Sequence, residues 1–164
     1  MLKLALALAL IALPAAAQAQ TPVRGGTAVQ AISADPPTMN PGTTTDTQAW
    51  TLMGKLFNGL THLDNEYRNH PDLAESWTVS ADGLTYTFKL RRDVKWHDGK
   101  PFTAEDVKFT YLEVLAKYHP VGRNAYTLVT AVDTPDPHTA VVRLKAPFGP
   151  FVFMTALNTG AIVP

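Results

Sequence analysis

The chain has 164 residues, with 14 Lys or Arg against 14 Asp or Glu, and 46% of its residues are hydrophobic. This composition is that of a folded globular protein, and the absence of a run of like charge argues against nucleic-acid binding and against electrostatic attachment to a membrane. The sequence contains no cysteine, which excludes disulfides, thiolate catalysis, Fe–S clusters and cysteine-based zinc sites.

The N-terminal segment has the layout of a secretory signal peptide. Lys3 precedes an apolar run from Leu4 to Ala17, and Ala17-Gln18-Ala19 has the small-residue pattern of a cleavage site. The apolar run is shorter than the roughly 20 residues that a membrane-spanning helix needs, and a lipoprotein anchor would require a cysteine. We therefore expect residues 1–19 to be removed, leaving a periplasmic protein that begins at Gln20 and is not a lipoprotein.

A weakly alternating strand is predicted over Thr27–Ile32, after Gly25-Gly26. It should end before Pro36-Pro37, because proline cannot donate a hydrogen bond to a ladder. The residues that follow, 38–47, read as a polar loop.

A helix is predicted after this loop, capped by Asp46 or Thr47. Trp50, Met53 and Phe57 recur at spacings of three and four residues, which is typical of a buried helical face. Asn58-Gly59 is expected to end the helix, since glycine adopts the left-handed conformation common at helix C-termini.

A short strand over 60–63 and a turn at Asp64-Asn65 lead to a predicted β-hairpin. Asp82-Gly83 supplies its turn, and Trp77 and Val79 should share a face with the partner strand. The residues that alternate in the second strand, with the period of two of a half-buried strand, are Leu84, Tyr86, Phe88 and Leu90.

The next predicted element is a helix from Ala104 to about Lys117. A turn at Asp98-Gly99 precedes it, and Thr103 with Asp106 forms a capping-box pattern at its start. Glu113 and Lys117 are spaced for an ion pair on its exposed face. The residues expected on its buried face are Val107, Tyr111, Val114, Leu115 and Tyr118.

The remaining sequence predicts a loop over 121–126, strands over 128–133 and 139–145, and a helical start after residue 146. A turn of Thr-Pro-Asp-Pro-His joins the two strands, and its prolines oppose further pairing.

Residues 74–115, AESWTVSADGLTYTFKLRRDVKWHDGKPFTAEDVKFTYLEVL, resemble in order and wording the signature of the family 5 solute-binding proteins. The shared pattern includes A-x-S-W, a D-G hairpin and V-K-W-x-D-G-x-P-F-T-A-x-D-V. Members of that family are receptors of ABC importers for peptides, dipeptides and nickel chelates. The resemblance implies a mixed α+β fold, the class II two-lobe fold of periplasmic binding proteins, of which only an N-terminal part, roughly a third, is expected here.

The signal-peptide pattern and the resemblance together divide the chain into four parts. These are a signal peptide (1–19), the first strand and cleft loop of lobe I (20–45), a β-rich inserted subdomain with helices (46–150) and the start of the return to lobe I (151–164).

The function implied by the resemblance is capture of an extracytoplasmic solute, foremost an oligopeptide, and its delivery to the membrane subunits of an ABC permease by a monomeric receptor. Two segments match cleft-facing parts of the family, although a solvated loop is the competing interpretation of the first. The candidate ligand-binding residues are Thr44, Thr45, Asp46, Thr47, Asn124 and Tyr126.

No catalytic or cofactor motif is recognisable in the sequence, so no enzyme activity, cofactor or metal site is predicted. The five histidines are far apart in the sequence and read as solvated or loop residues. Trp77 and Trp96 read as core residues rather than ligand-stacking platforms. The alternatives left open are a receptor for another solute (nickel chelate, sugar or opine), an exported structural or interaction domain, and an exported hydrolase.

Overall fold

The computed structural model describes residues 25–27 and 29–164. They belong to two units, which are described separately: the residues up to Ala31, and a compact unit from Ile32 to Pro164. The predicted signal peptide lies outside the described residues. Among the residues that the structure describes, no helix combines the length and the apolar character needed to span a bilayer.

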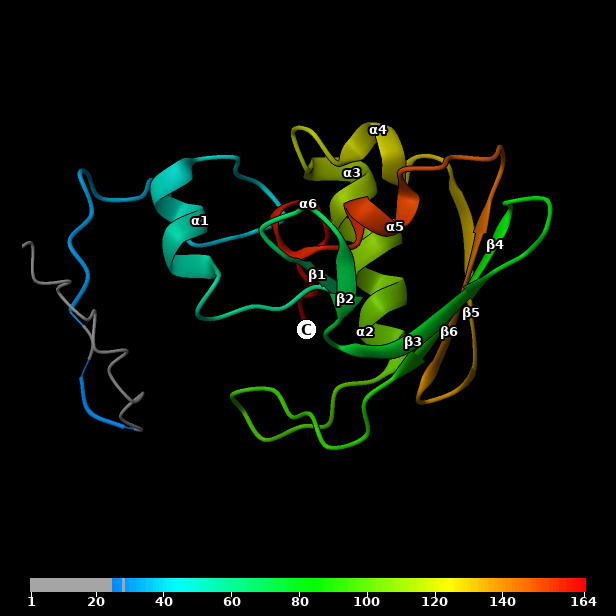
Figure 1. The fold of residues 1–164 in the computed structure, drawn as a ribbon, viewed down its shortest axis with the longest axis horizontal. Helices are drawn as coiled ribbons and strands as arrows, with labels where there is room; N and C mark the ends of the chain where they lie inside the picture. The colour runs from blue at the N-terminus through cyan, green and yellow to red at the C-terminus, as the bar shows by residue number, and fades with distance from the viewer. Residues whose placement is uncertain (1–24, 28) are drawn as a thin grey trace, which may run out of the picture. The chain divides into compact units, whose positions relative to one another are not determined.

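A four-stranded antiparallel sheet lies at one side of the compact unit, next to the helices (Figure 1). Its strands are β3 (Ala74–Val79), β4 (Thr85–Leu90), β5 (Val129–Asp136) and β6 (Thr139–Leu144), in the order β3-β4-β6-β5. Gly83 has a φ of 69° in the turn between β3 and β4, a conformation that glycine adopts without strain. The hairpin and the two later strands are therefore confirmed.

A separate ladder pairs β1 (Thr61–Leu63) with β2 (Asn69–Pro71). The Asp64 carboxylate organises the connection by accepting the backbone N–H groups of Glu66 and Arg68, both at 2.9 Å. This arrangement confirms the predicted turn after residue 63.

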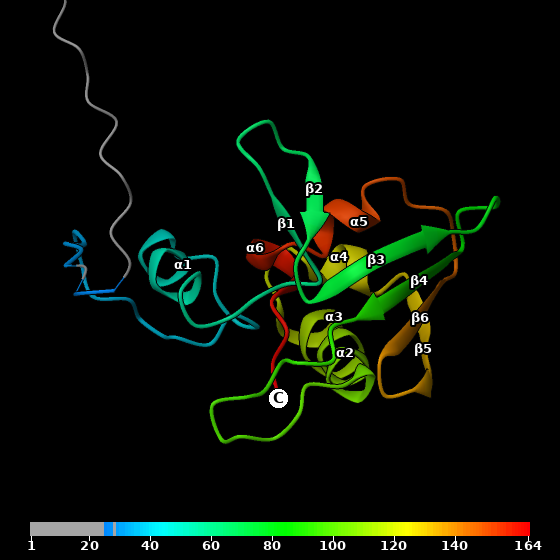
Figure 2. The same ribbon diagram turned by 60° about the horizontal axis from the view of Figure 1, so that its bottom comes forward.

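One continuous helical rod covers the sheet and consists of α2 (Ala104–Phe109), η1 (Thr110–Leu115) and α3 (Ala116–Tyr118) (Figure 2). At its start, the Asp106 carboxylate accepts the backbone N–H of Thr103 at 2.7 Å, as the capping-box pattern predicts. The middle segment, η1, is π-helical.

Four short helices complete the unit: α1 (Thr47–Met53), α4 (Arg123–Tyr126), α5 (Phe151–Met154) and α6 (Leu157–Gly160). Asp46 caps α1 as predicted, because its carboxylate accepts the Ala49 N–H at 2.9 Å.

The core lies between the helical rod and the sheet, where α2 and η1 pack against β5 and α2 also packs against β6. An aromatic cluster of Tyr111, Tyr126 and Phe151 joins the rod to α4 and α5, with ring centroids 4.7 to 6.4 Å apart. Other fully or nearly fully buried apolar residues are Tyr86, Phe88, Leu90, Phe102, Val107, Leu115, Val132, Ala140, Val142 and Leu144.

Two predictions about the first part of the chain are wrong: one expected strand does not form, and one helix ends earlier than expected. Residues 27 and 29–32 form no strand, and Val29 is 94% exposed; a strand requires a partner ladder, and no described residue supplies one here. The first helix ends at Met53 rather than at Asn58, since the chain turns at Gly54 and then extends. That extension lets the Gly59 carbonyl accept the Leu73 N–H at 3.2 Å.

Three further details differ from the prediction. Tyr118 is 64% exposed rather than buried, because the π-helical turn before it shifts the phase of the helix. Val79 is also exposed, at the outer end of the edge strand β3. The predicted loop 121–126 contains α4, and β5 continues to Asp136 into the predicted turn.

Candidate functional site

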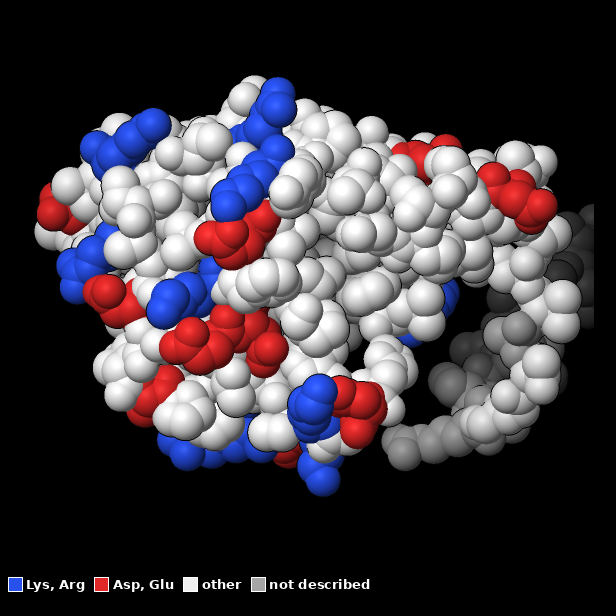
Figure 3. All heavy atoms as spheres, turned by 180° about the vertical axis from the view of Figure 1, so that it is seen from behind, with Lys and Arg blue, Asp and Glu red and all other residues white. Residues whose placement is uncertain are grey.

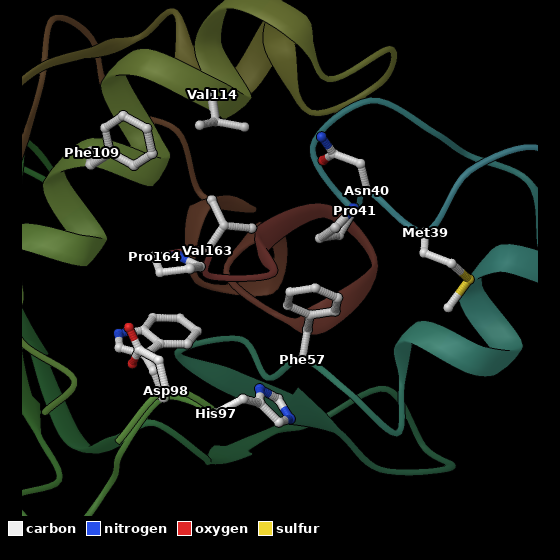
Figure 4. A pocket seen from close by; sticks show the side chains of 11 residues that line it. Met39, Asn40, Pro41, Phe57, His97, Asp98, Phe109, Val114, Val163 and Pro164 are labelled. Atoms are coloured by element: carbon white, nitrogen blue, oxygen red, sulfur yellow. The ribbon is translucent and has the colours of Figure 1, made fainter. Parts of the chain in front are cut away.

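A hollow of about 780 Å³ opens on the compact unit (Figure 4). Its volume lies in the range of small-molecule pockets, which are mostly apolar with a few polar groups. The residues that line it are Met39, Asn40, Pro41, Phe57, Trp96, His97, Asp98, Phe109, Val114, Val163 and Pro164.

These residues come from five segments that are distant in the sequence. As Figure 4 shows, Phe109 and Val114 project from the helical rod, Asn40 and Pro41 from the loop before α1, and Val163 from the end of the described chain. Large apolar side chains supply most of the wall. The hollow can therefore accept an apolar group while Asn40 and His97 offer polar contacts at its edge.

The loop 39–42 is held by local hydrogen bonds and by close packing. The Asn40 side-chain oxygen accepts the Gly42 N–H at 2.9 Å. Gly42 lies so close to the rod that a Cβ atom built on it would be 2.3 Å from Val114 Cγ1. The loop 39–42 forms one rim of the hollow, and any larger residue at position 42 would push this loop away from the helical rod.

The rim at Val163 is fixed by Thr110, which is fully buried in η1. The Thr110 hydroxyl donates to the Val163 carbonyl at 3.0 Å and accepts the Val163 N–H at 3.1 Å. One side chain thus satisfies both backbone groups of Val163.

The polar edge of the hollow is the turn at residues 97–99. Gly99 has a φ of 87°, which confirms the predicted turn. Asp98 accepts the Lys100 N–H at 3.0 Å and lies 2.8 Å from the Lys100 ammonium. The hydrogen bond from the Lys100 side chain holds the pKa of Asp98 below its usual value, so Asp98 stays ionised at neutral pH.

A smaller hollow of about 240 Å³ adjoins the first and shares Phe57, Trp96 and His97 with it. The Trp96 indole is half-buried and packs edge-on against Phe102, with ring centroids 6.1 Å apart. Within the described part of the chain, its N–H has no hydrogen-bond partner. Trp96 therefore lines both hollows, in addition to the packing role that the sequence predicted.

The predicted ligand residues of the first segment follow Asn40 and Pro41 in the sequence but do not line the hollow. Thr44 is buried and its hydroxyl accepts the Asp46 N–H at 3.1 Å. Asp46 caps α1, whereas Thr45 and Thr47 are exposed. The loop therefore combines a structural cap with two hydroxyls open to water.

The second predicted segment lies on α4 and does not line the hollow either. Asn124 is exposed. Tyr126 is completely buried, and its hydroxyl donates to the Met154 carbonyl at 2.8 Å. This position favours a packing role for Tyr126 over contact with a ligand.

The residues that sequence reasoning missed could be recognised only in part. Phe109 is 45% exposed, and it lies off the predicted buried face of its helix, so a large apolar residue on the solvent side was the available signal. Met39 and Pro41 lie within the predicted polar loop 38–47, but as apolar residues they were not among its candidate ligand residues. Nothing in the sequence pattern relates Phe57 or Val163 to them.

The histidines differ from the expectation of separate, solvated residues. His62 and His70 lie opposite each other on β1 and β2 with ring centroids 5.4 Å apart, and His70 Nε2 is 2.8 Å from Asp64. His119 is buried, and its ring Nδ1 accepts the Gly122 N–H at 2.7 Å. No group of three or more potential metal ligands occurs within residues 25–27 and 29–164.

Basic and acidic side chains are interspersed on the face seen in Figure 3. That face carries no extended patch of a single sign, in agreement with the equal numbers of basic and acidic residues. The surface drawn there has none of the concentrated positive charge with which proteins bind nucleic acids.

The fold matches part of the fold of periplasmic binding proteins. It superimposes with a TM-score of 0.73 on the binding protein AgaA from A. tumefaciens in complex with agropinic acid, at 32% identity, covering 79% of this chain and 26% of AgaA. Superposition on the OppA of Haemophilus influenzae in complex with RPPGFSPFR gives a TM-score of 0.71 at 28% identity, covering 80% of this chain and 29% of OppA.

Sequence comparison identifies the family. Residues 69–164 match the family described as bacterial extracellular solute-binding proteins, family 5, middle. The probable D,D-dipeptide-binding periplasmic protein DdpA of Escherichia coli is 35% identical over 136 residues, which are 80% of this chain and 26% of DdpA. The chain therefore belongs to the family 5 solute-binding proteins, and it spans about a quarter of the length of the curated relatives it matches.

Proposed function

We propose that this chain is part of the substrate-binding component of an ABC importer, which captures an extracytoplasmic solute and delivers it to the permease. The observation that carries the proposal is the largely apolar hollow of about 780 Å³ in a chain of this family. Relatives with similar sequences are named as binding D,D-dipeptides and glutathione. An oligopeptide is therefore the solute we favour.

The hollow forms one wall of the ligand cleft in this proposal. The remaining wall comes from the rest of a protein of which this chain is the N-terminal part, as the length of its relatives suggests. Closure of two lobes around the solute would distinguish the loaded receptor from the empty one at the permease. The receptor acts as a monomer and binds its solute without chemical change.

The exposed hydroxyls of Thr45 and Thr47 extend the polar rim of this cleft, beside Asn40. Main-chain and hydroxyl groups of such a loop suit the backbone of an extended peptide. Asn124 remains a candidate for a contact farther from the hollow.

An opine is the second candidate solute. The likeness to AgaA, which was solved with agropinic acid, has a TM-score of 0.73 at 32% identity. A polar opine would rely on the rim at Asn40 and His97 more than on the apolar wall.

Calorimetric titration with short peptides, with agropinic acid and with glutathione tests the function. The full-length protein should bind at least one peptide class. The chain 20–164 alone should bind none, because half a cleft leaves its hydrogen bonds open to water, where they contribute little. Binding of agropinic acid alone would select the second candidate, and micromolar peptide binding by the chain 20–164 would contradict the two-lobe mechanism.

Export to the periplasm is part of the same proposal. The mature protein recovered from the periplasm should begin at Gln20, which mass spectrometry of the N-terminus can establish. An intact Met1 in that fraction would contradict a cleaved signal peptide.

A further inference from the structure

Both backbone rims of the hollow rest on the π-helical turn η1. The rim at Asn40 and Pro41 is set by the contact of Gly42 with Val114. The rim at Val163 is set by the two hydrogen bonds of Thr110. Thr110 and Val114 are both residues of η1, so one turn of helix determines how far apart the rims stand.

The π-helical geometry also brings the side chains of the rod to the hollow. Phe109 and Val114 are five residues apart, a separation that in an α-helix would turn them about 140° away from each other, given 3.6 residues per turn. A π-helix has hydrogen bonds from i to i+5, and five residues make about one turn. The Ala116 N–H donates to the Tyr111 carbonyl in this pattern. Phe109 and Val114 can consequently line the same hollow, as Figure 4 shows.

We propose that η1 is the positioning element of the solute site and that Thr110 is its positioning residue. By holding Val163 at a fixed place in the lining of the hollow, Thr110 sets the shape of the hollow and hence the size of the apolar solute group that fits. The inference rests on the proposed function and deepens it: the receptor should discriminate among solutes by the size of one apolar side chain.

Two substitutions separate the hydroxyl of Thr110 from its volume. Thr110→Val keeps the buried volume but removes both hydrogen bonds to Val163, whereas Thr110→Ser keeps the hydroxyl. Thr155→Val is a matched control, because Thr155 is equally buried and its hydroxyl donates to the Val152 carbonyl at 2.7 Å, away from the residues that line the hollow.

The first measurement follows backbone protection in the full-length protein. Amide hydrogen exchange should show that Val163 loses protection in Thr110→Val, keeps it in Thr110→Ser and keeps it in Thr155→Val. Unchanged protection of Val163 in Thr110→Val would contradict the anchoring role.

The second measurement uses the full-length protein and two peptides that differ only in one side chain, Ala or Phe. Loss of two hydrogen bonds that hold a rim should change the affinity ratio of these peptides by about tenfold in Thr110→Val. In Thr110→Ser the affinity ratio of the two peptides should equal that of the unmodified protein. It should also be unchanged in Thr155→Val, even if that substitution lowers Tm.

The outcomes distinguish this inference from the proposed function. If the unmodified protein binds neither peptide nor any other in the panel, the proposed peptide receptor itself is refuted. If the unmodified protein binds both and Thr110→Val leaves their affinity ratio unchanged, the positioning role of Thr110 is refuted. An equal loss of affinity for both peptides in Thr110→Val and Thr155→Val would show a purely structural role.

Discussion

Trp77 and Phe88 lie directly opposite each other in the antiparallel ladder of β3 and β4. Phe88 is completely buried, whereas Trp77 is half-buried and packs against the edge of the same core. The shared face follows from the register that the sequence predicts, but the difference in burial follows from position, because β3 is an edge strand. The two residues should therefore contribute unequally to stability.

Phe88→Ala should lower the free energy of unfolding by about 3–5 kcal/mol, since it opens a cavity in close-packed surroundings. Trp77→Ala should cost less, about 1–3 kcal/mol, because part of the indole remains in water. Thr87→Ser, on the other face of β4, should have little effect. Urea denaturation of the three variants provides the comparison, and a larger loss for Trp77→Ala than for Phe88→Ala would contradict the observed burial.

Tyr111 and Tyr126 offer a second paired prediction. Burial raises the pKa of both phenols, so both stay neutral up to strongly alkaline pH. The Tyr126 hydroxyl donates to the Met154 carbonyl. Within the described residues, the Tyr111 hydroxyl has no partner in hydrogen-bonding geometry, although Tyr126 is near enough to affect its pKa.

Tyr126→Phe should lower the free energy of unfolding by about 1 kcal/mol, the net contribution of one hydrogen bond. Tyr111→Phe should be neutral or stabilising, because it removes a buried hydroxyl without a partner. Thermal unfolding at neutral pH can compare the two. The reverse order, with Tyr111→Phe the more damaging, would mean that the Tyr111 hydroxyl is bonded in solution.

Acid should destabilise the β1–β2 connection through Asp64. The Arg68 backbone N–H and the His70 side chain hold the pKa of Asp64 below its ordinary value of 3.8. A carboxylate with a depressed folded-state pKa contributes stability above its unfolded pKa and loses it as the pH falls through the folded pKa. The contribution of Asp64 to the free energy of unfolding should therefore be lost below about pH 3.8. Between neutral pH and about pH 5 this contribution should stay constant.

Asp64→Asn is the test of that acid dependence. Its free energy of unfolding should vary less with pH in the acid range than that of the unmodified protein, as followed by circular dichroism. If the free energy of unfolding had the same pH dependence in both proteins, Asp64 would contribute nothing to the loss of stability in acid.

Local patterns account for what the sequence predicted of the fold. The turn at Gly83, the cap at Asp46 and the capping box at Thr103 depend on residues within three positions of each other, so the sequence displays them directly. The alternation of Tyr86 and Phe88 likewise records one buried face of one strand. Each of these predictions is confirmed.

The hollow could not be predicted in the same way, because its walls come together only through tertiary packing. Phe57 and Val163 share no sequence pattern, and both lie in irregular segments. The π-helical turn has no recognisable sequence signature, and it moved Tyr118 from the predicted buried face into water. Family resemblance indicated the loop 44–47, which follows the lining residues Asn40 and Pro41 in the sequence but does not line the hollow.

Gly42 provides a final prediction about that packing. A Cβ atom at position 42 would lie 2.3 Å from Val114 Cγ1, a distance that requires either the loop or the rod to move. Gly42→Ala should therefore be destabilising, by about 1–3 kcal/mol if overpacking is the cause.

Val114→Ala removes the atom that the new methyl group meets. The double variant Gly42→Ala, Val114→Ala should accordingly be more stable than the sum of the two single effects, which denaturant unfolding of all four proteins measures as a coupling energy. Additive effects would mean that the loop 39–42 does not rest on Val114 in solution, and the rim of the hollow would then lack its support from the rod.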